Sequence, residues 1–306
     1  MKYIGYWEAN ASQLIFYKEG TETTVAVFDA GANNPKFSTV KGRVEVPTDV
    51  LSLCAFYLLG HLPPMLKPDA QNALMLSFGN GIASGTLTTH KIPALDVVEL
   101  APEMAQAAGA AYTKDNRNEL AYPGLTVQIE DARNFLLQTG RKFDIITTDA
   151  THPSNSSSWT LFTTEFYQQI KQYLTPEGVF LQWVPIHSMD VNDYKQILLT
   201  YQSVFPNATF WYTGGTHTLV LSTHYTLTLP LLEQKLQVTA AQPEVVQDLG
   251  DLKQIERYWI MNAGQLRQFT GPGTLVYDDN AHFLPINAEM QQLIQFIQDA
   301  AVKANP

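Results

Sequence analysis

The sequence predicts an α/β protein, in which a small antiparallel β-domain precedes a mostly parallel sheet covered by helices on both faces. Residues 2–46 contain short β-rich runs separated by turn residues, which is typical of β-hairpins. Residues 73–222 instead alternate apolar runs of strand length with helical segments, which is typical of a parallel sheet. We therefore expect two domains, one formed by residues 1–68 and one by residues 69–306.

The first domain is expected to contain β-hairpins followed by one connecting helix. Its β-rich runs are residues 3–7, 13–17, 23–28 and 37–46. Thr48 and Asp49 are typical of a helix start, and apolar residues follow them at helical spacing. The most apolar stretch, residues 50–66, contains His61, which favours a buried helix over a membrane span. We expect no membrane segment in this chain.

The second domain is expected to contain a seven-stranded sheet. The predicted strands are residues 73–78, 94–100, 125–129, 143–148, 179–183, 208–212 and 218–222. The last two surround Gly214 and Gly215, which predicts an antiparallel edge. This pattern matches the Rossmann-like sheet of S-adenosylmethionine-type enzymes better than a six-stranded dinucleotide fold. Helices at 229–237, at 245–258 and from 287 onward are expected to form a C-terminal extension.

Composition excludes several classes of function. The net charge is −10 and Lys and Arg form no cluster, which argues against a nucleic-acid partner. Cys54 is the single cysteine, so the chain has neither an internal disulfide nor a multi-cysteine zinc pattern, and we expect a reducing, cytoplasmic location. The histidines lack metal-ligand spacing, so we expect no metal.

A glycine turn joins the first two strands of the predicted parallel sheet. Gly79, Asn80 and Gly81 follow the first strand, and Glu99 ends the second about 20 residues later. Glycines let a backbone approach a ligand where a Cβ would clash, and a carboxylate at that distance can accept hydrogen bonds from ribose hydroxyls. This layout favours a nucleoside-binding βαβ unit over an ordinary tight turn with a surface Glu.

Further candidate residues follow the next strands, because ligands bind at the carboxyl ends of strands in open parallel sheets. Asp131 and Ala132 follow the third strand, where the Asp serves as a helix N-cap, as an acceptor for an adenine amino group, or as both. Asp149 follows the fourth strand and can orient or deprotonate an amine, although a turn-forming Asp is the structural alternative. His152 is a candidate proton carrier, with a loop residue bonded to its neighbours as the simpler interpretation. Residues 154–158 form a Ser-rich segment that can act as a lid.

With these residues placed, the chain resembles the polyamine aminopropyltransferases, the spermidine synthase family, and is closest to the branch often fused to membrane segments. The motifs that carry the resemblance are FGNGIASGTL, VVEL, IEDARNFL, FDIITTDATHP, GHLPPML and YDDNAHFLPIN. The resemblance implies that Glu99 binds ribose, that Asp131 lies near adenine and that Asp149 is catalytic.

The implied activity is a transferase of polyamine biosynthesis. It would use decarboxylated S-adenosylmethionine or S-adenosylmethionine as co-substrate, move an aminopropyl-type group to a small-molecule amine, and release methylthioadenosine. The resemblance also implies a homo-oligomer, either a dimer or a tetramer.

Four departures from the family pattern concern the amine half of the site. Asn80 stands where the family usually has Asp, His152 where it has a second acid, and Ala101 where an acid follows the ribose Glu. Residues 55–57, Ala-Phe-Tyr, replace a Tyr-His-Glu cluster. Since a dication needs carboxylates to offset its desolvation, the acceptor stays open.

Three alternatives to aminopropyl transfer also stay open. They are a methyltransferase that releases S-adenosylhomocysteine, a lyase or cyclase acting on the cofactor itself, and a catalytically inactive nucleoside-binding module. A nicotinamide dehydrogenase is disfavoured, because the glycine turn lacks the GxGxxG spacing.

Overall fold

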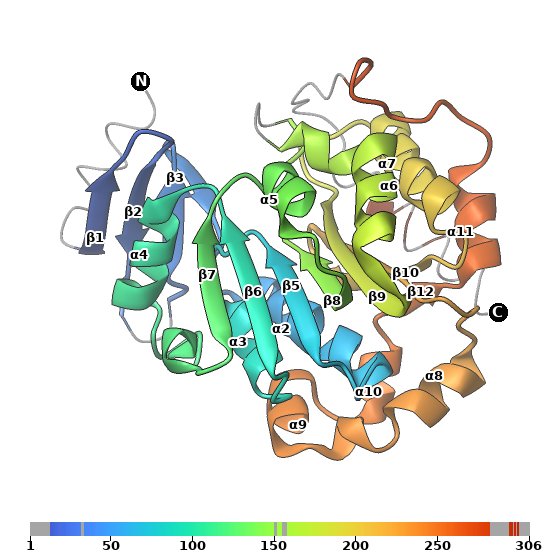
Figure 1. Cartoon of the computed structure of the whole chain (residues 1–306), viewed down its shortest axis with the longest axis horizontal. Helices are drawn as coiled ribbons and strands as arrows, with labels where there is room; N and C mark the ends of the chain where they lie inside the picture. Colours follow the sequence, from blue (N-terminus) through green and yellow to red (C-terminus); the bar gives the residue numbers. More distant parts are fainter. Residues whose placement is uncertain are drawn as a thin grey trace.

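The structure is a computed structural model that describes residues 13–31, 34–149, 152–154 and 158–281, with residues 294, 295, 297 and 299. It contains two sheets, and the smaller one lies beside β7 and α4 at one end of the larger one (Figure 1). The strand expected at residues 3–7 lies outside the described residues. The helix expected from residue 287 is described only at the four isolated positions.

The small sheet is antiparallel and has the strand order β1-β2-β3-β4. Its strands are β1 (Leu14–Glu19), β2 (Thr24–Phe28), β3 (Phe37–Val40) and β4 (Arg43–Glu45). Lys41 and Gly42 join the last two strands with positive φ angles of 50° and 78°, as a tight hairpin turn requires. Val25 and Val27 on one face of this sheet pack against Met104 and Ala107 of α4 (Pro102–Ala111). The predicted antiparallel hairpins are confirmed.

The larger sheet contains eight strands in the order β12-β10-β11-β9-β8-β5-β6-β7. The bounds are β5 (Asn72–Leu76), β6 (Ala94–Glu99), β7 (Leu125–Ile129), β8 (Phe143–Thr148), β9 (Leu174–Pro185), β10 (Thr209–Gly214), β11 (His217–Ser222) and β12 (Trp259–Met261). The neighbours β7, β6, β5, β8 and β9 are parallel, and β11, β10 and β12 add an antiparallel edge.

The expected count of seven strands is wrong, because β12 adds an eighth strand beside β10. Gly250, with a φ of 80°, divides the expected helix 245–258 into α9 (Pro243–Leu249) and α10 (Leu252–Glu256). The residues after α10 are then free to pair with β10. A strand of three residues is too short for its alternation to be recognised in the sequence.

Helices cover both faces of the larger sheet, and the strands are apolar on both sides as a result (Figure 1). One face packs against α2 (Val50–Leu66), α3 (Ile82–Thr88), α8 (Leu229–Leu236), α9 and α10. The other packs against α5 (Ala132–Thr139), α6 (Thr164–Tyr173), α7 (Val191–Val204) and α11 (Ala263–Thr270). Short 3-10 helices lie at Glu119–Ala121, Trp159–Phe162 and Thr239–Ala241. In the part of the chain that the structure describes, no helix combines the length and apolar character that crossing a membrane needs.

Candidate functional site

The glycine turn after β5 has a backbone path that few side chains allow. Gly79 and Gly81 have φ angles of 57° and 79°, and Ser77 also lies in the left-handed region at 81°, which is unusual for a residue with a Cβ. A Cβ on Gly81 would lie 1.7 Å from Oε1 of Glu119, and a Cβ on Gly79 would lie 3.1 Å from Val46. The turn therefore needs glycine at position 81 for both its conformation and its packing.

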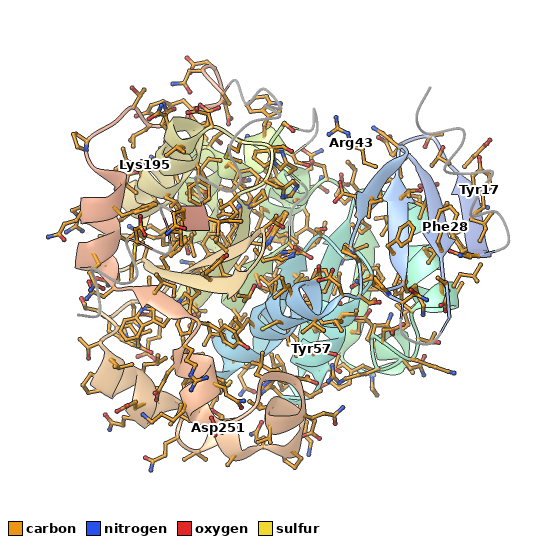
Figure 2. All side chains as sticks on the ribbon, turned by 180° about the vertical axis from the view of Figure 1, so that it is seen from behind. Tyr17, Phe28, Arg43, Tyr57, Lys195 and Asp251 are labelled. Atoms are coloured by element: carbon orange, nitrogen blue, oxygen red, sulfur yellow. The ribbon has the colours of Figure 1, made fainter. Side chains whose placement is uncertain are left out.

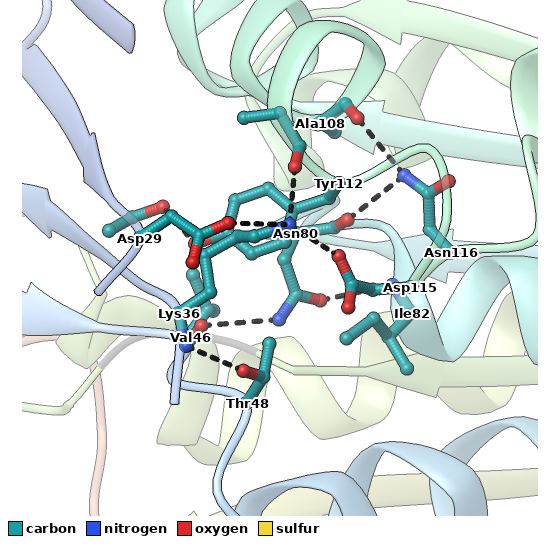
Figure 3. Close-up of polar contacts among 12 residues, drawn as sticks. Asp29, Lys36, Val46, Thr48, Asn80, Ile82, Ala108, Tyr112, Asp115 and Asn116 are labelled. Carbon is teal, nitrogen blue, oxygen red and sulfur yellow. Dashed lines mark hydrogen bonds and ion pairs between the residues drawn. The ribbon is translucent and has the colours of Figure 1, made fainter. Parts of the chain in front are cut away.

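Asn80 lies in this turn, and its side chain fastens the turn to the small sheet (Figure 3). Its Nδ2 donates to the carbonyl oxygen of Val46 at 3.2 Å, while its Oδ1 accepts from the amide of Ile82 at 3.0 Å. Asn116 donates to the Asn80 carbonyl oxygen at 3.1 Å. The buried amide side chain thus has a structural task, and its contact with a nucleoside stays a prediction.

Glu99 ends β6 and is buried against the same turn. Its Oε2 accepts from the amide of Phe78 and its Oε1 from the amide of Ala101, both at 2.9 Å. Burial raises the pKa of Glu99, and these backbone donors offset part of that rise. The amides of Gly79 and Leu100 also act on this carboxylate, so backbone donors surround it, and its contact with ribose hydroxyls stays a prediction.

Asp131 follows β7 and is the N-cap of α5. Its Oδ1 accepts from the amides of Arg133 and Asn134, each at 3.0 Å. The N-cap interpretation is confirmed, and no described residue hydrogen-bonds to Oδ2. Ala132 is the first residue of α5. A role for either residue beside adenine stays a prediction.

Asp149 directly follows β8, and its backbone lies beside the glycine turn. Its amide donates to the Leu76 carbonyl oxygen at 3.2 Å, and the pairing of Thr148 with Gln182 puts Asp149 level with Trp183 of β9. Burial, together with the negative charge of Glu45, raises the pKa of Asp149 to about 7. A carboxyl with this pKa can take up a proton near neutral pH.

Glu45 is a second acid of this site that the sequence analysis missed. It ends β4, and burial raises its pKa to about 7 although the Arg43 guanidinium opposes the rise. Arg43 lies on the margin of the small sheet nearest the rest of the molecule (Figure 2). The sequence identified this region only as a hairpin. An acid between the apolar Val44 and Val46 was the available signal.

Two imidazole rings follow the carboxyl ends of β8 and β9 in the chain. His152 contacts the oxygen of Ser154 through Nδ1 at 2.7 Å and the His187 carbonyl oxygen through Nε2 at 2.6 Å. The His152 and His187 ring centroids are 4.8 Å apart, and the His187 centroid is 6.3 Å from that of Trp183. The His152 contacts agree with a loop residue bonded to its neighbours, and its catalytic role stays a prediction.

Burial lowers the pKa of His187 to about 4, with smaller contributions from His152 and His217. Burial also lowers the pKa of His152. These rings are therefore uncharged at neutral pH. Among the described residues, no group of three or more His, Cys, Asp or Glu side chains is arranged to hold a metal.

Sequence comparisons relate the chain to one family. A model of the spermine/spermidine synthase domain matches residues 56–220. Polyamine aminopropyltransferase 2 of Aquifex aeolicus is 30% identical over 125 residues, which cover 40% of this chain and 25% of that protein. The polyamine aminopropyltransferase of Buchnera aphidicola subsp. Schizaphis graminum is 27% identical over 166 residues, covering 52% and 58%. The chain thus spans less than two thirds of these curated relatives.

Solved structures with the same fold include spermidine synthase in complex with the transition state analogue AdoDATO. Its TM-score is 0.64 at 18% identity, and the match covers 78% of this chain and 88% of that one. Spermidine synthase from Thermotoga maritima has a TM-score of 0.61 at 18% identity, with 71% and 75% covered. This chain thus resembles the two spermidine synthase structures in having a small antiparallel sheet together with a larger mixed sheet.

Proposed function

The chain belongs to the spermine/spermidine synthase family, and on that premise we propose that it transfers an aminopropyl-type group to an amine. The group would come from decarboxylated S-adenosylmethionine or S-adenosylmethionine, and methylthioadenosine would be released. One observation carries this proposal. The glycine turn, Glu99, Asp131 and Asp149 follow β5, β6, β7 and β8, which are neighbours in the sheet, so the candidate residues gather at one edge.

The nucleoside part of the co-substrate is assigned to three of these strand ends. Gly79 and Gly81 would let the backbone approach the nucleoside, Glu99 would accept the ribose hydroxyls, and Asp131, with Ala132, would contact adenine. The position of Glu99 against the glycine turn and the unbonded Oδ2 of Asp131 support these roles.

Asp149 is the proposed catalytic residue. It would take the proton of the acceptor ammonium, and the freed amine would attack the carbon next to the sulfonium. A C–N bond then forms as the C–S bond breaks, and its electron pair stays on the sulfur of methylthioadenosine. The sulfonium is already a good leaving group, so the protein mainly supplies positioning and a base. The partial burial of Asp149 and its raised pKa support this role.

The remaining expectations belong to the same proposal. We propose that residues 1–68 form the hairpin domain with its connecting helix and residues 69–306 the Rossmann-like nucleoside-binding catalytic domain. We also propose a homo-oligomer and a cytoplasmic location, as for a biosynthetic enzyme of this family.

Product analysis by mass spectrometry tests the function. The protein is incubated with S-adenosylmethionine or its decarboxylated form, with and without amines. We expect methylthioadenosine that depends on an amine and is lost in Asp149→Asn. Methylthioadenosine without an acceptor would indicate a lyase or cyclase, and S-adenosylhomocysteine would indicate methyl transfer. Binding of methylthioadenosine without any turnover would indicate an inactive module.

A further inference from the structure

The small sheet reaches the proposed catalytic residue through the glycine turn. Val46, the residue after Glu45, accepts the hydrogen bond of Asn80 and approaches Gly79. Asp149 is bonded to the other end of this turn through the Leu76 carbonyl oxygen. Glu45 and Asp149 thus approach the same turn from its two ends, and the charge of Glu45 contributes to the raised pKa of Asp149.

The backbone at Val46 holds an unusual conformation at this junction. Its φ of 44° lies in the left-handed region, which a β-branched residue rarely adopts. Such a conformation persists where the surroundings fix it, and here the bond from Asn80 does so. The backbone that directly follows Glu45 is thereby fixed to the glycine turn.

We propose that Glu45 and Asp149 together bind the ammonium group of the acceptor, and that the acceptor is a primary amine with one positive charge and an uncharged body. The inference rests on the proposed function. Glu45 would act as a specificity-determining residue, supplied by the small sheet. It replaces one of the acids that the chain lacks at Asn80 and His152.

The surroundings of the carboxyl pair favour a single charge on the acceptor. The side chains that follow β8 and end β9 carry no negative charge that would offset a second ammonium. They are His152, His187 and Trp183. Nδ1 of His187 is buried without a hydrogen-bond partner among the described residues, and burial keeps this ring uncharged, so it supplies no negative charge to a second ammonium. Asp49 is another acid near this part of the molecule, where α2 contacts His217. Its carboxylate is already used as the N-cap of α2.

The charged groups around the pair determine how readily each of its two carboxyls is protonated. Arg43 favours the ionised form of Glu45, while Glu45 disfavours the ionised form of Asp149. Arg43 also acts on His152, which is neutral. When the ammonium of the acceptor gives its proton to the pair, the amine becomes the nucleophile and one carboxyl becomes neutral. The net charge of the carboxyl pair then becomes less negative by one unit. No reactant other than the acceptor and the co-substrate is needed.

The test compares butylamine with butane-1,4-diamine, which differ only in the second amine. With decarboxylated S-adenosylmethionine, we expect kcat/KM for butylamine to equal or exceed that for the diamine. Glu45→Gln should raise the KM for butylamine about tenfold or more and move the acidic limb of the pH–rate profile to lower pH. Glu45→Asp should restore part of the affinity. Glu22→Gln, an exposed charge removal in the turn between β1 and β2, should change neither quantity.

A binding measurement separates this inference from the proposed function. Calorimetry with butylamine in the presence of methylthioadenosine needs no turnover, and thermal unfolding confirms that each variant is folded. Weaker binding in Glu45→Gln supports the inference even if no amine yields product. Equal binding by the wild type and Glu45→Gln, or a clear preference for the diamine, would overturn it.

Discussion

The side-chain amide of Asn80 donates to the carbonyl oxygen of Val46 at 3.2 Å, and this bond joins the glycine turn to the small sheet (Figure 3). The resemblance to the family implies an Asp at this position. A carboxylate could still accept from Ile82, but it cannot donate to Val46. Two carbonyl-type oxygens would then face each other.

Asn80→Asp should therefore destabilise the protein by about 1–3 kcal/mol, because the Val46 carbonyl loses its donor and meets a negative charge. Urea unfolding at pH 7.5 measures the change. Asn72→Asp is the matched control, since Asn72 also donates to a carbonyl oxygen, that of Lys142, and accepts from an amide, but at a half-buried position. Equal losses in the two variants would refute the structural role of Asn80.

Asp149→Asn should lower kcat by about 100-fold or more, because the amide cannot accept the amine proton. Affinity for methylthioadenosine should stay within a factor of about two, since the nucleoside is assigned to other residues. Asp144→Asn, at the opposite end of β8, should keep near-normal turnover. Full activity of Asp149→Asn would exclude Asp149 as the base.

The wild-type rate should depend on pH through Asp149. Burial and the charge of Glu45 raise the pKa of Asp149 to about 7, so its carboxyl is protonated, and inactive as a base, below that pH. Activity should rise as the pH passes through about 7, whereas an ordinary Asp would be fully ionised there. A profile that is flat between pH 5.5 and 8 would contradict this assignment.

Gly81→Ala should cost more stability than Gly140→Ala. Both glycines have a positive φ, 79° and 58°, so a Cβ strains either position by about 1–2 kcal/mol. A Cβ at 81 would also overlap Glu119, whereas nothing lies within 4 Å of one at 140. The difference between the two variants in unfolding free energy measures the overlap. Methylthioadenosine affinity should fall only in Gly81→Ala, and no difference would argue against a rigid turn.

A buried histidine pair should make the fold sensitive to acid. Nδ1 of His61 lies 2.8 Å from Nε2 of His90, and Nε2 of His61 lies 2.8 Å from the carboxylate of Asp248. Burial, with a contribution from the charge of His61, lowers the pKa of His90 to about 3, while an unfolded histidine titrates near 6.5. The unfolded chain thus binds more protons between these values. Stability from His90 is complete above pH 6.5 and falls as the pH drops, by up to about 1.4 kcal/mol per pH unit.

Urea unfolding at pH 7.5, 6 and 5 tests this dependence. His90→Gln should flatten the slope, and His224→Gln, at an exposed position, should leave it unchanged. If the slope of His90→Gln matches that of the wild type, another group controls the acid sensitivity.

Local patterns made much of the fold predictable. The parallel strands, the glycine turn and the N-cap at Asp131 depend on residues adjacent in the chain, and each leaves a signal within a few positions. The eighth strand escaped detection, since Trp259–Met261 is too short to alternate visibly and becomes a strand only by pairing with β10. Strand-end positions also located Glu99 and Asp149, because a parallel sheet puts its carboxyl ends on one edge.

The sequence by itself therefore determined the family, the α/β architecture and the candidate residues at the strand ends. Only the tertiary structure decided that the hairpin end after Glu45 meets the glycine turn beside Asp149, that Asn80 is bonded to Val46, and that His152 lies against His187. The physical reason is that periodicity and turn chemistry act over a few residues. Burial, charge and hydrogen bonding between distant segments depend on how those segments pack, as the small sheet does against α4.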